Sequence, residues 1–230
     1  MYTTRELLAN PGNYNGSRDV SKIQYIVIHY TGNDGDRAAN NARYFRDNIV
    51  NASAHYFVDD DSVWLSVPED RVAWSVGGKK YANAGKTGGG KMYGKITNTN
   101  SISVEMCDTI RNGVYQASEK TLENTVDLVR LLMEKYNIPV ENVFRHFDVT
   151  GKHCPSYLVS ERKWEEFKRR LVAKPMDNTP ATGHKEGVDW AKKNGILAGN
   201  SEGDLMLSQP VTRQQLCTML LRYHKKFGGE

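Results

Sequence analysis

The sequence predicts an α/β fold, in which helices flank a central β-sheet, followed by a small helical domain at the C-terminal end. Two apolar runs with the composition of buried strands, IQYIVIHY at 23–30 and SISVEMCD at 101–108, supply the sheet. Between and after them lie segments whose apolar residues recur at helical spacing. A break with two prolines at 173–184 then separates these elements from the last stretch of chain.

The first predicted strand ends near His29, and a polar residue that closes a buried strand is well placed to face a cleft. A helix is predicted over 37–50, with one apolar face. That face comprises Ala39, Ala42, Phe45 and Ile49. A hairpin is predicted over 53–67, with the turn at the polar run 59–62.

Residues 77–100 are rich in glycine, lysine and asparagine and predict a long loop rimming a cleft. The GKT triplet at 85–87 resembles the end of a phosphate-binding loop. However, the position that requires the first glycine is Lys80, and no strand precedes it. We therefore do not expect a nucleotide site here.

The second predicted strand alternates, so that Ile102, Val104 and Met106 point one way and Ser103, Glu105 and Cys107 the other. Glu105 is thus expected to face away from the main apolar contacts. Helices follow over 118–137, capped by Ser118, and over 160–172, capped by Ser160.

The C-terminal segment 185–230 predicts a helix, a glycine-rich turn and a second helix. A unit of under ~60 residues buries little core by itself. The expected core residues are Trp190, Leu197, Leu216, Leu220 and Leu221.

The composition, with 39% hydrophobic and 25% charged residues in 230, is that of a soluble globular protein. The net charge of +4 predicts mild attraction to polyanions such as teichoic-type wall polymers. No polybasic or aromatic–basic pattern indicates nucleic-acid binding, and no apolar run predicts membrane insertion. Three scattered cysteines argue against a disulfide scaffold. The N-terminal segment lacks the features of a secretory signal, so we expect synthesis in the cytoplasm.

The stretch RHFDVTGKHCPSYL at 145–158 holds two histidines, a cysteine, an aspartate and a lysine. Imidazole and thiolate are ligands that zinc prefers, so His146, Cys154 and the distant His29 are candidates for a three-ligand catalytic site. The spacing alone is not diagnostic, and a buried core role stays open. A cysteine nucleophile with His146 or His153 as base is the rival, although no helix start follows Cys154 to activate its thiolate.

Several motifs in this order resemble the zinc-dependent N-acetylmuramoyl-L-alanine amidases, a family that includes the peptidoglycan recognition proteins. They are IVIHYTGN, SAHYFVDD, AWSVGG, NSISVEMC and RHFDVTGKHCP, within residues 20–172. Together they are specific, because no one of them is expected to arise with the others by chance. The resemblance implies a three-layer α/β domain on a mixed sheet, and it is greatest to phage endolysins and bacterial autolysins.

The resemblance also implies roles for five residues. His29, His146 and Cys154 would ligate Zn²⁺, which lowers the pKa of its water and polarises the amide carbonyl. Glu105 would be the general base that takes the proton of the water and returns it to the leaving amine. Lys152 would stabilise the negative charge on the carbonyl oxygen.

The roles of other residues in or near these motifs are less defined. The tyrosine that some family members carry before the histidine of SAHYF is Ala54 here, which places more of the proton transfer on Glu105. His55 and Trp74 are possible substrate contacts, with a structural role as the equal alternative for His55 and a place in the core as the alternative for Trp74. Asp148 is expected to orient a ligand or shape the loop, and His153 to lie on the surface.

The C-terminal segment resembles the later part of an S-layer homology motif, through NGILAG, GD and VTRQQL. Such units usually occur as several repeats and bind anionic wall polymers, whereas one incomplete copy is present here. Arg213 is therefore a possible wall-polymer contact, with pairing in the helix cap begun by Thr212 as an alternative. Self-association into a homo-oligomer is the other possibility for so small a unit.

The sequence thus predicts a zinc amidase domain at 1–172, a linker at 173–184 and a small helical module at 185–230. The predicted enzyme cleaves the amide bond between N-acetylmuramic acid and L-alanine of the stem peptide in bacterial peptidoglycan. A peptidoglycan-binding module without activity and a cysteine peptidase using Cys154 are the alternatives. Release to the wall is expected through membrane holes made by a holin-like partner.

Overall fold

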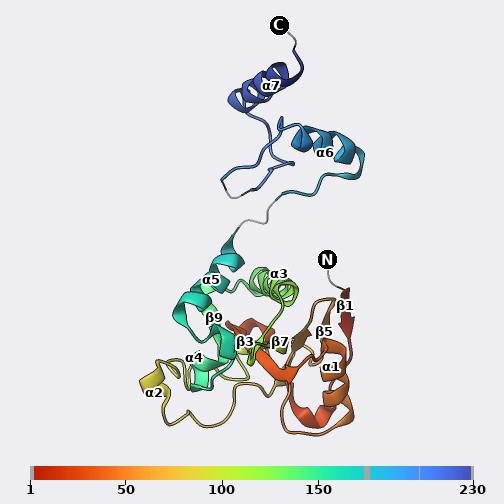
Figure 1. Ribbon diagram of the computed structural model, residues 1–230. Helices are drawn as coiled ribbons and strands as arrows, with labels where there is room; N and C mark the ends of the chain where they lie inside the picture. The colour runs from red at the N-terminus through yellow and green to blue at the C-terminus, as the bar shows by residue number, and fades with distance from the viewer. Residues whose placement is uncertain (1–2, 174–176, 202, 229–230) are drawn as a thin grey trace. The chain divides into compact units, whose positions relative to one another are not determined.

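A computed structural model describes residues 3–173, 177–201 and 203–228 of the chain (Figure 1). The chain divides into two compact units, Met1–Val172 and Ala173–Glu230. Residues 174–176 of the predicted linker lie outside the described residues. Among the helices of the described part, none combines the length and the apolar character that crossing a bilayer requires.

The first unit contains both strands and helices, and the described part of the second unit contains helices alone. The strands are β1 Thr3–Glu6, β2 Tyr14–Ser17, β3 Tyr25–Asp34, β4 Tyr56–Val58, β5 Ser62–Leu65, β6 Arg71–Ala73, β7 Ser101–Arg111, β8 Val114–Gln116 and β9 Val143–Arg145. The helices are α1 Ala38–Asp47, α2 Ala84–Thr87, α3 Glu119–Tyr136, α4 His146–Thr150, α5 Glu161–Val172, α6 Lys185–Lys193 and α7 Arg213–Phe227.

The central sheet is mixed, as expected for this fold class. Within the described residues it has seven strands in the order β1-β5-β4-β7-β3-β9, with β8 paired to β7. The pairs β1–β5, β4–β7, β7–β3 and β3–β9 are parallel, whereas β4–β5 and β7–β8 are antiparallel. Strands β2 and β6 form a separate antiparallel pair. The two apolar runs recognised in the sequence, β3 and β7, therefore lie side by side at the centre.

Helices cover both faces of this sheet. Alternate residues of β3 and β7, among them Ile28 and Val104, pack with α3 and α5 in the largest apolar cluster. The opposite face meets α1 through Phe57 and Cys107, and meets α4 through Val27. This strict alternation follows from the two-residue period of a strand, and it places His29 and Glu105 on the α1/α4 face.

Local signals in the sequence account for most element boundaries. Helix α3 begins after Ser118, whose Oγ accepts a hydrogen bond from Thr121 N at 2.9 Å. The predicted hairpin is formed by β4 and β5. The predicted helix over 37–50 is too long, because α1 ends at Asp47. Ile49, expected on its apolar face, lies beyond the helix and is 62% exposed. Within the predicted loop 77–100, the structure adds the single-turn helix α2.

The expected core of the C-terminal unit is wrong. Of the described residues in this unit, only Ile196 is buried. Trp190 is 45% exposed and stacks on Phe227 at a ring-centroid distance of 5.6 Å. Leu216, Leu220 and Leu221 are also exposed, and Leu197 is half-buried. Two helices of 9 and 15 residues have too little surface to enclose these side chains, as expected for so short a unit.

A buried carboxylate ties the end of α3 to the sheet. Glu69 accepts hydrogen bonds from the hydroxyls of Tyr56 on β4 and Tyr136 on α3, both at 2.6 Å, and pairs with Lys135. Its side chain is 12% exposed. Burial alone raises the pKa of this carboxyl, but the bonds from Lys135, Tyr136 and Tyr56 outweigh it and hold the pKa below 4.5. The ionised form is therefore the one that stabilises the fold.

Replacing this carboxylate tests its contribution. We expect Glu69→Gln to lower the free energy of unfolding by about 1–3 kcal/mol near neutral pH, because charge-assisted hydrogen bonds are lost. A depressed pKa in the folded state gives stability above the unfolded pKa that disappears as the pH falls through the folded value. The difference between variant and wild type should therefore shrink below about pH 4 in denaturant titrations.

The matched control is Glu123→Gln, which removes an exposed carboxylate paired with Lys120 at 3.0 Å on α3 itself. Its effect should stay within about 0.5 kcal/mol at every pH. An equal loss of stability in both variants would contradict the special role of Glu69.

Candidate metal centre

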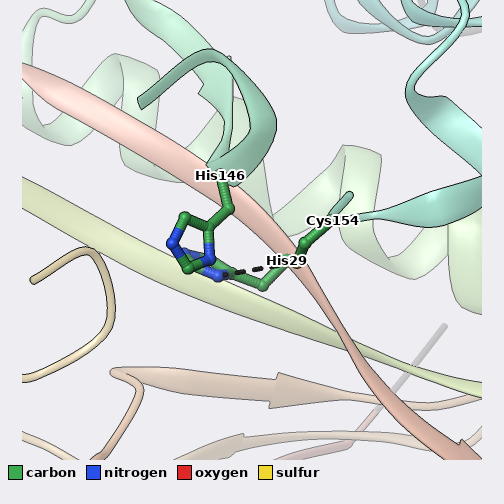
Figure 2. A group of neighbouring side chains, drawn as sticks. All are labelled: His29, His146 and Cys154. Atoms are coloured by element: carbon green, nitrogen blue, oxygen red, sulfur yellow. Dashed lines mark hydrogen bonds between the residues drawn. The ribbon is translucent and has the colours of Figure 1, made fainter. Parts of the chain in front are cut away.

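Three side chains that lie far apart in the sequence converge on the α1/α4 face of the sheet. His29 comes from β3, His146 is the first residue of α4, and Cys154 lies in the loop that follows α4. All three are buried, with exposed fractions of 2%, 7% and 1%. Figure 2 shows the side chains of His146 and Cys154 converging on His29.

The candidate ligand atoms are close enough to bind one ion. The nearest nitrogen or sulfur atoms of His29, His146 and Cys154 all lie within 4.8 Å of one another. His29 Nδ1 is 3.9 Å from Cys154 Sγ, and the centroids of the two imidazole rings are 4.6 Å apart. Two bonds of about 2.0–2.3 Å from a shared zinc ion span such a nitrogen–sulfur separation.

Burial favours the neutral imidazoles that a metal needs. The pKa of His29 is well below 6.5, first because of burial and then because of the positive charges of His146 and Lys152. Burial, with Lys152, lowers the pKa of His146 to about 4. Both rings therefore keep a free lone pair at neutral pH, and His146 Nδ1 is buried without a hydrogen-bond partner among the described atoms.

The donor set fits zinc better than a cysteine nucleophile. Burial, and next the charge of Glu105, raise the pKa of the Cys154 thiol above its usual range. A nucleophilic cysteine needs a lowered pKa, so this environment disfavours the cysteine peptidase alternative. A bound divalent cation would have the opposite effect, because coordination favours the thiolate and the proton is released to solvent.

Glu105 lies directly beside His29, because the two residues are paired in register on the parallel strands β7 and β3. Its Oε1 atom is 3.7 Å from His29 Nδ1, and its Oε2 atom is buried without a partner among the described atoms. Burial raises the pKa of Glu105 to about 8, with Lys152 opposing and Asp108 and Asp36 adding to the shift. A carboxylate with so high a pKa is a stronger base than usual and suits proton transfer near neutral pH.

Asp108, on the same strand, was not singled out in the sequence. It is 5% exposed, and its Oδ2 atom has no partner among the described atoms. Burial, and then Asp36, raise its pKa to about 7. Its effect on this site is electrostatic, since its charge raises the pKa of Glu105. A sequence pattern gives no sign of this, because the proximity of Asp36 and Asp108 depends on the packing of two separate segments.

Lys152 and His153, adjacent in sequence, are both exposed. The ammonium charge of Lys152 acts on both histidines, on Cys154 and on Glu105, so its side chain belongs to the same site. His153 contacts only the edge of the Phe147 ring among the described aromatic residues, at 6.3 Å between centroids. The sequence prediction of a surface position for His153 is confirmed.

The two possible substrate contacts differ in their surroundings. His55 is 1% exposed, and both ring nitrogens have partners: Nδ1 with Ser103 Oγ at 3.0 Å and Nε2 with Arg18 at 2.9 Å. A buried ring with partners at both nitrogens favours the structural role for His55, and contact with a substrate stays a prediction. Trp74 is half-buried and stays a prediction.

A buried arginine, also missed in the sequence, holds the loop that carries two of the candidate ligands. Arg145 precedes His146 and is 2% exposed. Its guanidinium donates to both carboxylate oxygens of Asp148, at 2.9 and 2.6 Å. It also donates to the carbonyl oxygens of Leu158 and Val159, at 3.0 and 2.8 Å. Asp148 therefore shapes the loop and does not orient a ligand imidazole.

In the C-terminal unit, Arg213 is exposed at the first turn of α7. The cap of this helix is made by Thr212 and Gln215, which exchange side-chain to backbone hydrogen bonds at 3.2 and 2.8 Å. The alternative prediction, in which Arg213 pairs within this cap, is therefore wrong. Its binding to a wall polymer stays a prediction.

Comparison with known proteins gives a family and several relatives. The N-acetylmuramoyl-L-alanine amidase model matches residues 19–157. The chain is 34% identical to N-acetylmuramoyl-L-alanine amidase CwlA of Bacillus subtilis over 91% of this chain and 75% of the relative. It is 36% identical to the amidase BlyA of the same species over 66% of this chain, but it spans only 42% of that relative. The structure of PlyL is similar, with a TM-score of 0.59 and 32% identity, over 74% of this chain and 98% of that one.

The arginine at the base of the ligand loop can be tested by stability. Arg145→Met leaves the Asp148 carboxylate buried without its partner, so we expect the free energy of unfolding to fall by about 3–5 kcal/mol. The control, Arg162→Met, removes an arginine that is 80% exposed and lies 3.9 Å from Glu166. It should change stability by less than about 1 kcal/mol in the same denaturant titration. Similar values for both variants would show that the buried arginine is dispensable.

Proposed function

The chain belongs to the N-acetylmuramoyl-L-alanine amidase family, and from this membership we propose that it hydrolyses bacterial peptidoglycan at the amide bond between N-acetylmuramic acid and L-alanine. The observation that carries the proposal is the convergence of His29, His146 and Cys154 beside Glu105. This donor set is the kind that a catalytic zinc site uses, with three protein ligands and a fourth position for water or substrate.

We assign the site residues as follows. His29, His146 and Cys154 hold the zinc ion, because they are the buried nitrogen and sulfur donors that face one another. Zinc supplies Lewis acidity, which lowers the pKa of water and polarises a carbonyl oxygen. Glu105 accepts the proton of the attacking water and returns it to the leaving amine of L-alanine. Its raised pKa and its position 3.7 Å from His29 support this role.

Lys152 stabilises the negative charge that develops on the amide carbonyl oxygen, since its ammonium is exposed and acts on every other group of the site. Trp74 remains a proposed substrate contact at the edge of the same domain. The buried ring of His55, with protein partners at both nitrogens, supports a structural role more than a substrate contact.

We further propose that residues 1–172 form the catalytic domain and that 185–230 form a separate module joined by the linker 173–184. The exposed Arg213 suits contact with an anionic wall polymer. The exposed apolar residues of α7 suit self-association equally, so both remain proposed partners of the module. Release to the wall through membrane holes made by a holin-like protein belongs to the same proposal.

The reaction is tested by the products of wall digestion. Purified peptidoglycan treated with the protein should gain new L-alanine amino termini, detected by amino-terminal labelling, without new reducing sugar ends. A rise in reducing ends would assign the chain to the glycosidases and overturn the proposal. Binding to peptidoglycan without any new termini would indicate the inactive binding module.

The assignment of base and metal is tested by two variants that should behave differently. Glu105→Ala should lower the rate by at least about 100-fold while one zinc per chain is retained, because a general base contributes catalysis and no ligand atom. Cys154→Ser should lose both zinc, measured by elemental analysis, and activity. The exposed Cys217 provides the control, and Cys217→Ser should keep both. Full activity after metal removal, with inactivation by a thiol reagent, would favour the cysteine peptidase instead.

A further inference from the structure

The loop between β6 and β7 has an unusual distribution of charge. No aspartate or glutamate occurs between Asp70 and Glu105, whereas five lysines do. We call these residues the lysine rim: Lys79, Lys80, Lys86, Lys91 and Lys95. All five are exposed, and none forms an ion pair within the described residues. Five lysines in 17 residues without an acidic residue among them create a local positive potential that the net charge of +4 does not reveal, although Glu161 lies near enough to act on Lys91.

This loop is docked on the helix that carries a candidate ligand. Three backbone hydrogen bonds attach it to α4: Tyr81 N to Thr150 O at 2.8 Å, Gly90 N to Phe147 O at 2.9 Å, and Met92 N to Asp148 O at 2.9 Å. Figure 1 shows α2, within this loop, lying beside α4. Because α4 begins at His146, the loop that carries the lysine rim is attached to the same helix as this candidate ligand.

Glycines make this close approach possible. A Cβ atom at Gly89 would lie 2.9 Å from Gly151 Cα and 2.8 Å from the Phe147 ring. A Cβ atom at Gly151 would overlap Ala84 of α2. The close contact between the loop and α4 therefore requires glycine at both Gly89 and Gly151. It holds the loop that carries the lysine rim in a defined position against α4.

We propose that the lysine rim binds the phosphodiester backbone of an anionic wall polymer and so holds the wall against the catalytic site. This inference rests on the proposed function for the nature of the partner. It differs from the role suggested for Arg213, because it places polymer binding on the catalytic domain itself. The rim adds a second point of attachment, which acts on the same wall that is being cut.

Lysine chemistry favours a repeating phosphate over a single carboxylate. No arginine occurs between Arg71 and Arg111, so the loop lacks the planar fork that binds one carboxylate in fixed geometry. A lysine ammonium acts as a point charge that tolerates many orientations, which suits a flexible chain of phosphates. Several lysines that bind one polyanion also release its counterions together, so the affinity depends steeply on salt.

The test is a binding titration with lipid-free poly(glycerol phosphate) at several salt concentrations. The triple variant Lys79→Gln, Lys86→Gln and Lys95→Gln removes three rim charges on exposed residues. Lys80 is left in place because it lies across Gly90. We expect the affinity to fall at least about tenfold at low salt, and the slope of log K against log salt to fall by roughly two to three.

A charge-matched control removes three exposed cations elsewhere in the first unit: Lys22→Gln, Lys163→Gln and Arg169→Gln. Its affinity should stay within about twofold of wild type, because these residues lie outside the rim. Equal losses in both triple variants would overturn the proposal, since only net charge would then matter. Equal binding to duplex DNA of matched charge would overturn the assignment to a wall polymer.

Hydrolysis of a small soluble N-acetylmuramoyl-L-alanine peptide separates this inference from the proposed function. The rim variant should cut this substrate at the wild-type rate, because the peptide carries no phosphate polymer. Failure of the wild type to cut it would count against the amidase proposal alone, since the binding titration involves no hydrolysis. If the wild type cuts the peptide but the rim variant binds the polymer as tightly as the wild type does, the proposed role of the lysine rim alone would be overturned.

Discussion

The candidate site depends on one buried cation. The Arg145 guanidinium ties Asp148, within α4, to the carbonyl oxygens of Leu158 and Val159 beyond the loop that follows this helix. Cys154 lies between these two anchors, and His146 directly follows Arg145 in the chain. The loop after α4 has many possible conformations, and a guanidinium that is hydrogen-bonded at both ends of the segment favours one of them. The relative position of two of the three candidate ligands thus depends on an arginine that is not itself a candidate ligand.

Much of the framework could be predicted from the sequence. The β-branched run ending at His29 and the alternation around Glu105 identified the two central strands, because a strand has a fixed two-residue period. The start of α3 followed from Ser118, since capping is a local interaction. The candidate ligands were also identified, but through the resemblance of whole motifs. The spacing of His146 and Cys154 alone left zinc, a nucleophile and a core role open.

What the sequence did not reveal depends on contacts between distant segments. The sequence left a substrate contact and a structural role open for His55, and only the fold shows Ser103 and Arg18 at its ring nitrogens. Arg145 was not singled out, since nothing local shows that carbonyls 13 and 14 residues away will turn toward it. The apolar residues of α7 suggested a core, but a pattern of spacing cannot tell whether enough chain is present to cover them.

The parallel pairing of β3 and β7 has a consequence for the geometry of the site. His29 and Glu105 face each other through the register of two adjacent strands, so their separation does not depend on the 75 residues of chain between them. That intervening chain contains α1, the hairpin and the lysine-bearing loop. The sheet alone therefore sets the position of these two residues relative to each other, whereas the loop that carries the proposed lysine rim lies outside the sheet.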